Sequence, residues 1–505
     1  MKNNTFESVP LLRIVVSLMT GILVGEYVAM PLPLCVTFMA LVVLALLLWK
    51  FPLLQSVTIT LCFLVLGAVL IQRQKNQQVS WPEGEVCYEA VVLTDPVEKP
   101  KTMAVDILLP ANHRKLKAYL YKDDRSRALS VGDGLRIQSR IQSEQRFLDR
   151  TFVSSWKWKK VNLSLKGLSR LERTKLFFLK QRSRLLKRLS SRGLSDEQYA
   201  IVAAMALGDK SALTKDLREI YNVTGASHVL ALSGLHLGII YVLLSLLIRG
   251  RHWQAFSQLT IVMCIWAFVF LVGMPVSVVR SAFMLSLYAL LSLGHRDKMT
   301  VNTLAFTAIV LLIINPQSLF DVGFQMSFLS VLAILVFLPL FEMVFSQQYL
   351  MDHRLLKWVW SMFSISFSAQ LGVAPLIAYY FGRISTISLL TNFIVIPAAT
   401  LVLYLSLIVF VVPSLCFLLV ELVGLLNTVL TRLSAIPGAS IEGLHPSIIQ
   451  TAMMYVIVAA VYLLIVKLLS LHIAKPTQDI VEVRKDHQQD QDTETNIFST
   501  NHEGL

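Results

Sequence analysis

The residues best suited to chemistry stand in one short stretch, residues 224–238, which reads Thr-Gly-Ala-Ser-His-Val-Leu-Ala-Leu-Ser-Gly-Leu-His-Leu-Gly. Serine and histidine side chains can transfer protons or act as nucleophiles. The stretch enters an apolar run, where polar groups are costly unless they face protein or water. It therefore predicts either a helix-packing seam with satisfied histidines or a broken helix that lines a pore. The candidate residues are Thr224, Gly225, His228, Ser233, Gly234, His236 and Gly238.

Further polar residues interrupt the later apolar runs. A buried hydrogen bond would explain any one of them. Together they predict discontinuous helices around a polar route through a membrane. These residues are Arg280, Asp321, Gln325, Gln370 and Asn392.

Ser233 could be the nucleophile of an intramembrane protease only if a base from another span reached its hydroxyl. The histidines downstream of residue 236 all fall in loops, at span edges or in the polar tail. His236 lies three residues on, about 60° around a helix, and is expected to be poorly placed. The sequence therefore predicts no catalytic residue, no metal ligand and no cofactor.

The elements that must position these residues are mostly transmembrane helices. The chain has 505 residues, of which 55% are hydrophobic and only 15% charged. Long apolar runs of about 20 residues are expected to cross the bilayer. We predict about twelve spans in a polytopic α-helical membrane protein. The runs are Leu11–Met30, Leu32–Trp49, Pro52–Ile71, His228–Ile248, Leu259–Val272, Val276–Leu293, Val301–Ile314, Phe324–Phe345, Trp358–Tyr380, Ile384–Val411, Leu415–Leu430 and Ile448–Leu469.

A polar insert, residues 72–164, separates the third run from the rest and alternates like β-strands. Five short strands are expected, at Glu85–Leu93, Thr102–Leu109, Lys117–Tyr121, Gly134–Ser139 and Ser154–Leu163. They predict a small β-barrel, for which an OB-like fold is the commonest solution. Any other small β-domain would show the same alternation.

Positive charge gathers where this insert ends. Thirteen of the residues from Lys157 to Arg192 are Lys or Arg, against one acid, Glu172, in a chain whose net charge is +14. Such a block is typical of a contact for anionic lipid, for nucleic acid or for both. Leu165–Leu189 is expected to be an amphipathic helix lying in the membrane interface. Candidate DNA contacts, by charge or base stacking, are Tyr121, Trp156, Lys157, Trp158, Lys159, Lys160, Arg182 and Arg184.

Cations in the short loops predict the orientation. Lys50, Arg249 with Arg251, Arg296 with Lys298, and Arg354 with Lys357 fall on one side of the expected spans. The positive-inside rule makes that side cytoplasmic, so the β-domain faces outward. The predicted regions are three N-terminal helices (1–71), the OB-like domain (72–164), basic amphipathic and connecting helices (165–227), a transmembrane channel domain (228–470) and a polar disordered tail (471–505).

The stretch from Gly208 through His236, with its Ala-Leu-Ser-Gly-Leu-His core, resembles the hallmark of the ComEC family of DNA-uptake proteins. The pieces Arg280-Ser281-Ala282, Asp321–Phe328, Ala369–Gly372 and Asn392 with Pro397 follow in the family's order. The resemblance implies a multi-pass channel in the bacterial inner membrane that passes single-stranded transforming DNA. It also implies three partner proteins: a DNA receptor, a separate nuclease and a cytoplasmic DNA translocase. Membrane lipids are further expected partners, and a homodimer is one expected mode of assembly.

Many members carry a C-terminal metallo-β-lactamase-like domain, and this sequence shows none. Its ten histidines include no His-x-His pair, so we expect no nuclease activity of its own. A small-molecule or lipid transporter remains the main alternative, because broken helices with midplane polar groups also occur there. The basic outward β-domain argues against it, since a small-substrate carrier has no need for one.

Overall fold

The computed structural model describes residues 10–28, 34–76, 81–82, 84–143, 149–163, 167–248, 254–293 and 300–469. The chain divides into two compact units, one of residues 1–332 and 384–441 and one of residues 333–383 and 442–505. The predicted tail at 471–505 lies outside the described residues. So do Arg249, Arg251, Arg296 and Lys298, on which part of the predicted orientation rests.

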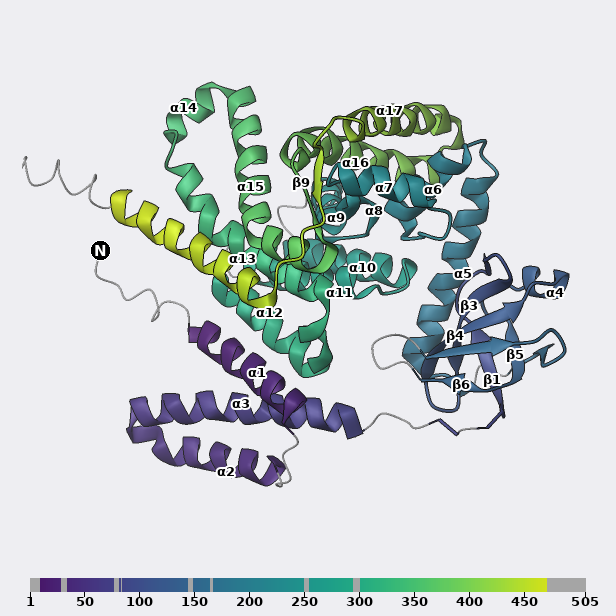
Figure 1. The fold of residues 1–505 in the computed structure, drawn as a ribbon, viewed down its shortest axis with the longest axis horizontal. Coiled ribbons are helices and arrows are strands. Elements are labelled where there is room, and N and C mark those ends of the chain that lie inside the picture. Colours follow the sequence, from purple (N-terminus) through teal and green to yellow (C-terminus); the bar gives the residue numbers. More distant parts are fainter. Residues whose placement is uncertain are drawn as a thin grey trace, which may run out of the picture. The chain divides into compact units, whose positions relative to one another are not determined.

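Three apolar helices open the first unit (Figure 1). They are α1 (Pro10–Tyr27), α2 (Leu34–Leu47, extended by the 3-10 turn η1 at Leu48–Lys50) and α3 (Pro52–Asn76). Helices α1 and α3 pack backbone to backbone: a Cβ on Gly21 would lie 1.9 Å from the Leu64 carbonyl oxygen, and one on Gly67 2.4 Å from that of Leu18. Small residues permit such close approach, which strengthens helix contacts where no hydrophobic effect operates.

An eight-stranded curled sheet follows. Its strands are β1 (Val86–Val92), β2 (Val97–Glu98), β3 (Thr102–Leu109), β4 (Arg114–Tyr121), β5 (Gly134–Ser139), β6 (Ile141–Gln142), β7 (Arg150–Val153) and β8 (Trp158–Val161). The order is β6-β7-β4-β3-β1-β5-β8, with β2 beside β3. One residue separates β5 from β6, yet β6 lies at the far edge of this order. The chain therefore bends there, and the sheet curls into a half-barrel.

Inward-facing residues of this sheet, among them Ile107, Leu116, Leu120, Leu135 and Ile137, form one buried core. The predicted bounds of the strands at Thr102–Leu109 and Gly134–Ser139 match the structure. The predicted strand at Ser154–Leu163 is shorter, because residues 154–157 form a turn before β8. Strands β2, β6 and β7 were not expected. The OB-like assignment stays a prediction.

Helix α5 (Arg170–Ser190) begins with a capping box in which Ser169 and Glu172 bond each other's backbone N–H, and it runs beside the sheet (Figure 1). Leu176 and Leu179 pack on Val91 and Leu108 of the sheet. Leu189, one residue before the helix end, packs into the helical core. Protein therefore covers most of the apolar face of α5, while Leu171 and Phe177 are exposed. The interpretation of this segment as a helix lying in the membrane interface stays a prediction.

The remaining helices of the first unit include α6, whose residues from Ala200 to Leu207 are all buried. Helix α6 begins with a capping box of Ser195 with Gln198 and ends at Gly208, which has a positive φ. Their bounds are α6 (Asp196–Leu207), α7 (Lys215–Val223), α8 (Ser227–Leu230), α9 (Gly234–Leu247), α10 (Gln254–Leu271), α11 (Val276–Leu293), α12 (Val301–Ile314), η3 (Pro316–Phe320), α16 (Ser388–Val411), η4 (Pro413–Leu415) and α17 (Cys416–Ser434).

Helix α13 (Val322–Glu342) passes from the first unit into the second, which also holds α14 (Gln347–Asp352), α15 (Arg354–Phe381) and the helix at Ile448–Leu469. Aromatic residues pack α13 against α15 in this unit. Trp360 donates to the Phe341 carbonyl at 3.0 Å, and the ring of Phe341 contacts the ring of Phe367. The short strands β9 (Arg383–Ser385) and β10 (Ser440–Glu442) pair with each other.

Seven described helices are long and apolar enough to cross a membrane, and five shorter apolar helices of 10–17 residues accompany them. The long ones are Pro10–Tyr27, Pro52–Asn76, Val322–Glu342, Arg354–Phe381, Ser388–Val411, Pro413–Ser434 and Ile448–Leu469. The membrane character of the chain is thus supported, while the count of about twelve spans stays a prediction.

Candidate functional site

The stretch at residues 224–238 is a break between helices. Helix α7 ends at Thr224, α8 is a single turn, and Ala231 to Ser233 are extended before α9 begins at Gly234. The carbonyl of Leu232, in this gap, accepts a hydrogen bond from the Ser277 hydroxyl of α11 at 2.9 Å. The chain is therefore broken here, and a side chain of another helix satisfies the backbone that the break exposes. That the break lines a pore stays a prediction.

Thr224, Gly225 and His228 shape the first turn of this break. The buried Thr224 hydroxyl donates to the Ile220 carbonyl at 2.8 Å. Gly225 has φ +77°, and a Cβ there would stand 2.7 Å from Cβ of Ser388 on α16. The Gly225 carbonyl oxygen lies 3.0 Å from Nδ1 of His228. These three residues hold the chain in its turn, so their first role is structural.

Ser233 and His236 lie closer together than the sequence suggested. Ser233 precedes α9 rather than lying on it, and its hydroxyl reaches Nδ1 of the fully buried His236 at 3.3 Å. The expectation that His236 is poorly placed for Ser233 is therefore wrong. The same nitrogen accepts the Ser233 backbone N–H at 3.4 Å, as a capping residue does. No partner for the His236 Nε2 is found within the described part of the chain, whereas a nucleophile's base needs an orienting group.

Gly234 and Gly238 differ in their surroundings, although both lie on α9. A Cβ on Gly234 would meet the Ser281 hydroxyl of α11 at 3.0 Å, and one on Gly238 would meet nothing within 4 Å. The Gly-x-x-x-Gly pair is therefore a packing contact only at its first glycine. At Gly238 the backbone of α9 borders open space.

Arg280 and Asp321 join α11 to the start of α13. The Arg280 side chain is 4% exposed; its Nη2 donates to the Gly323 carbonyl at 2.8 Å, and its Nη1 lies 3.4 Å from Oδ1 of Asp321. The same carboxylate oxygen accepts the backbone N–H of Phe324 at 2.8 Å, which caps α13. Gln325 donates to the Leu319 carbonyl at 2.9 Å. Paired in this way, a buried charge is tolerable.

Asn392 and Gln370 occupy different units. Asn392 lies on α16, and its Oδ1 is buried without a hydrogen-bond partner among the described residues. Gln370 lies half-buried on α15 in the second unit, five residues before Pro375. Tyr455 there donates to the Gly372 carbonyl at 2.8 Å, beside this proline. The structure brings together Thr224, Gly225 and His228, then Ser233 with His236, and Arg280 with Asp321, rather than all candidates at one point.

The β-domain carries a second candidate surface, which we name the β4 strip. It consists of Lys115, Lys117, Tyr119 and Tyr121 on β4 with Phe152 on β7. Alternate residues of a strand share a face, and here they face away from the core formed by Leu116, Ala118 and Leu120. The rings of Tyr119 and Phe152, which are register partners, stack with centroids 5.0 Å apart.

Of the β4 strip, only Tyr121 was singled out from the sequence. Tyr119, Lys115 and Lys117 could have been found by extending the same alternation backward along the strand. Phe152 could not, because β7 pairs with β4 in parallel across a long connection that no local pattern predicts. Phe152 and Tyr121 are both more than half exposed, so the strip offers open aromatic faces beside cations.

Trp156 and Trp158 have opposite environments. Trp156 is 81% exposed, whereas Trp158 is 5% exposed and belongs to the core. The prediction of Trp158 as a stacking surface is therefore wrong. Its ring lies under the guanidinium of Arg125, 5.3 Å from the ring centre.

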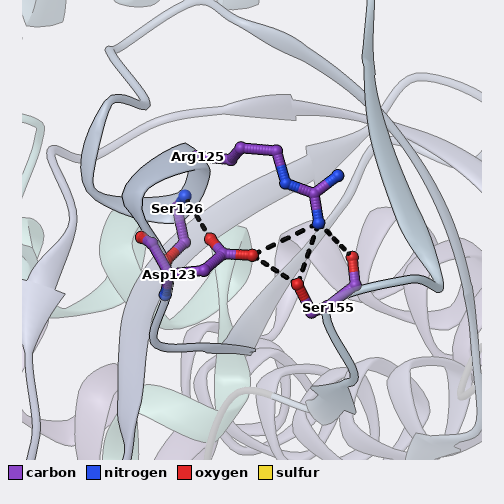
Figure 2. Close-up of polar contacts among 4 residues, drawn as sticks. All are labelled: Asp123, Arg125, Ser126 and Ser155. Atoms are coloured by element: carbon purple, nitrogen blue, oxygen red, sulfur yellow. Dashed lines mark hydrogen bonds and ion pairs between the residues drawn. The ribbon is translucent and has the colours of Figure 1, made fainter.

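Figure 2 shows what holds the turn that presents Trp156. Arg125 donates to the Ser155 carbonyl at 2.7 Å and lies 3.3 Å from the Asp123 carboxylate, which also bonds the Ser155 hydroxyl. Asp123 in addition accepts the Ser126 N–H at 2.7 Å, capping the short helix α4 (Asp124–Arg127). Partial burial alone would raise the pKa of Asp123, but the hydrogen bonds from Ser155, Ser126 and Arg125 bring it below its ordinary value.

The cationic residues that were predicted to contact DNA also differ in their exposure. Lys159 and Arg184 are exposed. Lys157 pairs with Glu85, and Lys160 with Asp133 at 2.8 Å. Arg182 is nearly buried, donates to the Leu207 carbonyl at 2.8 Å at the end of α6, and lies 4.0 Å from Asp209. Burial lowers the pKa of Arg182, against the opposing charge of Asp209. Arg182 therefore closes a helix end, and its assignment as a DNA contact is wrong.

Residues 205–468, which include both the helix break and the Arg280–Asp321 pair, match the competence protein family. The chain belongs to this family. The predicted ComEC resemblance is thereby confirmed. Among the described residues of this competence protein, no three His, Cys, Asp or Glu side chains gather closely enough to hold a metal ion.

Curated relatives extend the match beyond that region. The competence protein is 25% identical over 361 residues, 68% of its length, to ComE operon protein 3 of Bacillus subtilis, of which the match covers 45%. It is 27% identical over 282 residues to an uncharacterized protein of Aquifex aeolicus, covering 56% of this chain and 60% of that one. It is 23% identical over 206 residues to Recombination protein 2 of Haemophilus influenzae, covering 39% and 26%. Each match spans less than two thirds of the relative, and no solved structure matches.

Proposed function

We propose that this chain acts in DNA uptake during natural competence, as a multi-pass protein of the bacterial inner membrane that passes a single strand of DNA. The match of residues 205–468 to the competence protein family carries this proposal. The likeness to ComE operon protein 3 and Recombination protein 2 supports it. A DNA receptor, a separate nuclease and a cytoplasmic translocase would act with it.

In this proposal the β4 strip is the first surface that the DNA meets. Lys115 and Lys117 neutralise phosphates, and Tyr119, Tyr121 and Phe152 present ring faces on which bases stack. Stacking tolerates any base, because every base has a π-face. The strip therefore suits capture of single-stranded DNA without sequence preference, with Trp156 as a further ring nearby in sequence.

The membrane helices would carry the strand onward past α9. Gly238 leaves bare backbone facing open space, and the break before Gly234 lets polar groups stand at membrane depth. A polar polymer needs such a surface, since the hydrocarbon of the bilayer offers it no hydrogen-bond partner. The Arg280–Asp321 pair holds the neighbouring helices in place without itself contacting the DNA.

Gene deletion with complementation tests the proposal. We expect a deletion strain to bind labelled duplex DNA at its surface and to yield no transformants, and the full chain to restore them. Gly238→Leu should restore abundance but not transformation, because the new side chain fills the open space beside α9. Normal transformation in the deletion strain would contradict the proposed function.

Variants in the same deletion strain also test the alternative function, a small-molecule or lipid transporter. A transporter would not need the β4 strip, so alanines at Tyr119, Tyr121 and Phe152 would leave its activity unchanged. Under the DNA-uptake proposal these alanines reduce transformation. Unchanged transformation at normal abundance would favour the transporter.

A further inference from the structure

The turn at residues 154–157 presents a large apolar ring to solvent on a backbone that is held by hydrogen bonds. The Lys157 N–H donates to the Ser154 carbonyl at 3.0 Å and closes the turn, which places Trp156 near its tip. Trp156 is 81% exposed. Single exposed apolar residues are common on protein surfaces, so the exposure alone indicates no function. What sets this ring apart is the number of contacts that hold the backbone on both sides of it.

Arg125 makes the contacts on the side that precedes the ring (Figure 2). Its Nη2 donates to the Ser155 carbonyl at 2.7 Å and to the Ser155 hydroxyl at 2.8 Å. The Asp123 carboxylate binds both this nitrogen and that hydroxyl. The guanidinium also lies over the ring of the buried Trp158, 5.3 Å from its centre. A planar guanidinium can make all of these contacts at once, and the ammonium group of a lysine cannot.

The chain that follows the ring is bonded to the sheet as well. The Lys157 carbonyl accepts the Gln138 N–H of β5 at 2.8 Å, and the Lys157 ammonium pairs with Glu85. Trp158 then enters β8 and the core of the sheet. The backbone around Trp156 is therefore ordered while its ring is open. Such a ring can take a planar ligand with little further loss of conformational entropy.

Trp156 also continues the line of rings on the β4 strip. Strands β4 and β7 run in parallel, with Tyr119 and Phe152 as register partners. The chain therefore leaves both strands at the same end of the sheet. There Asp123, two residues after β4, binds Ser155, two residues after β7. Trp156 thus follows the rings of the strip at the end opposite to its lysines.

We propose that Trp156 is the last stacking position of the β4 strip and that Arg125 is the residue that positions it. The inference rests on the proposed function and deepens it, because it gives the path of the strand. Phosphates bind at Lys115 and Lys117, the next bases stack on the rings of the strip, and a final base stacks on Trp156. Stacking on an indole tolerates any base. Arg125 acts through the turn and needs no contact with the DNA.

Equilibrium binding tests the stacking position. The ligand is a fluorescent oligothymidylate of about 16 nucleotides, and the full chain is held in phosphatidylcholine nanodiscs. Trp156→Ala should weaken binding about tenfold, because a base loses its stacking surface, and Trp156→Phe, which keeps a ring, should stay within about threefold. Arg125→Lys keeps the charge without the planar contacts, so it should weaken binding about fivefold.

A double-mutant cycle separates positioning from a direct phosphate contact. If Arg125 acts through Trp156, Arg125→Lys should change the affinity of the Trp156→Ala chain by less than about twofold. Ser155→Ala removes one hydroxyl from the same network, so it should show the same dependence on Trp156 with a smaller effect. The control is Arg127 on α4, which lies 3.7 Å from Asp124: Arg127→Lys should leave the affinity of the unaltered chain within about twofold.

Two outcomes would overturn the inference while leaving the proposed function intact. Unchanged affinity in Trp156→Ala would remove the stacking position. Losses that multiply in the Arg125→Lys, Trp156→Ala chain would show that Arg125 binds a phosphate and does not position the ring. If the unaltered chain bound no oligonucleotide, the proposed function itself would fail.

The membrane interface is the competing environment for an exposed tryptophan. A photoreactive phospholipid in the nanodisc tests this use. We expect no crosslink between this lipid and the peptide that contains Trp156 when the oligonucleotide is bound. A lipid crosslink to Trp156 that the oligonucleotide does not reduce would show that the ring serves the membrane, and the inference would be wrong.

Discussion

The polar residues of the β-domain and those of the membrane helices serve different ends. On the β4 strip, alternate side chains of one strand face away from the core of the sheet. Around the α8–α9 break, the polar groups turn inward and bond backbone. Charged and aromatic residues on an exposed face therefore indicate a ligand more strongly than do motif residues at a helix break, whose first effect is to hold the fold.

Substitutions at two glycines of the motif give the strongest test of this difference. Gly225→Ala should lower the free energy of unfolding by about 1–3 kcal/mol, because φ is positive and Cβ would meet Ser388. Gly238→Ala, in a helix with open space, should leave stability unchanged or raise it by up to about 1 kcal/mol. Thermal unfolding of the detergent-solubilised variants measures both. Equal stability of the two would contradict the structural role of Gly225.

The strip can be tested against an exposed aromatic residue elsewhere. Tyr119→Ala combined with Phe152→Ala should weaken single-stranded DNA binding by about 10- to 100-fold, since stacking contributes about 1–3 kcal/mol per base. Phe177→Ala, an exposed ring on α5, should leave affinity within about twofold. Fluorescence anisotropy with the full chain in nanodiscs reports both. A loss of similar size in Phe177→Ala would show that the strip is not special.

A smaller effect is expected at Ser233. Ser233→Ala removes a contact with His236 but no nucleophile, so transformation should fall by no more than about tenfold, in proportion to the roughly 1 kcal/mol of a lost cap. Transformation frequency, normalised to protein abundance, measures this. If Ser233→Ala abolished function while Ser233→Thr preserved it, a catalytic serine would have to be considered again.

The orientation can be checked without a new cysteine. Cys87 is exposed on β1, and the other four cysteines lie in apolar helices. A chain that retains Cys87 alone should react with an impermeant thiol reagent in cells whose outer membrane is permeabilised, and Cys87→Ser should not react. A cysteine in place of Asp123 is unsuitable for labelling, because the Asp123 carboxylate binds Ser126, Arg125 and Ser155. Labelling of Cys87 only after lysis would reverse the topology.

Local pattern predicted much of the fold. Alternation along Thr102–Leu109 and Gly134–Ser139 identified two strands to the residue. Parallel pairing of β7 with β4 depends on residues distant in sequence, so no local signal announced it. The two tryptophans were treated as one strand face, but residue 156 lies in a turn, where a period of two no longer applies.

The site was predicted less well, for two physical reasons. A basic residue on an amphipathic helix usually faces solvent, and Arg182 does not, because the last carbonyls of α6 need a donor. The Ser233–His236 spacing was judged on a continuous helix, whereas the chain breaks at Ser233 and brings the hydroxyl back to the imidazole. The first error concerns a tertiary partner and the second a local break in the helix, and sequence spacing alone shows neither.

Photo-crosslinking tests the central claim, that the β4 strip receives single-stranded DNA, most directly. An oligonucleotide of about 16 nucleotides carrying 5-iodouracil, bound to the full chain in nanodiscs and irradiated, couples to aromatic rings stacked on it. We predict crosslinked peptides that contain Tyr119, Tyr121 or Phe152, and their loss in the Tyr119→Ala, Phe152→Ala variant. Crosslinks confined to other segments, or unaffected by that variant, would contradict the account.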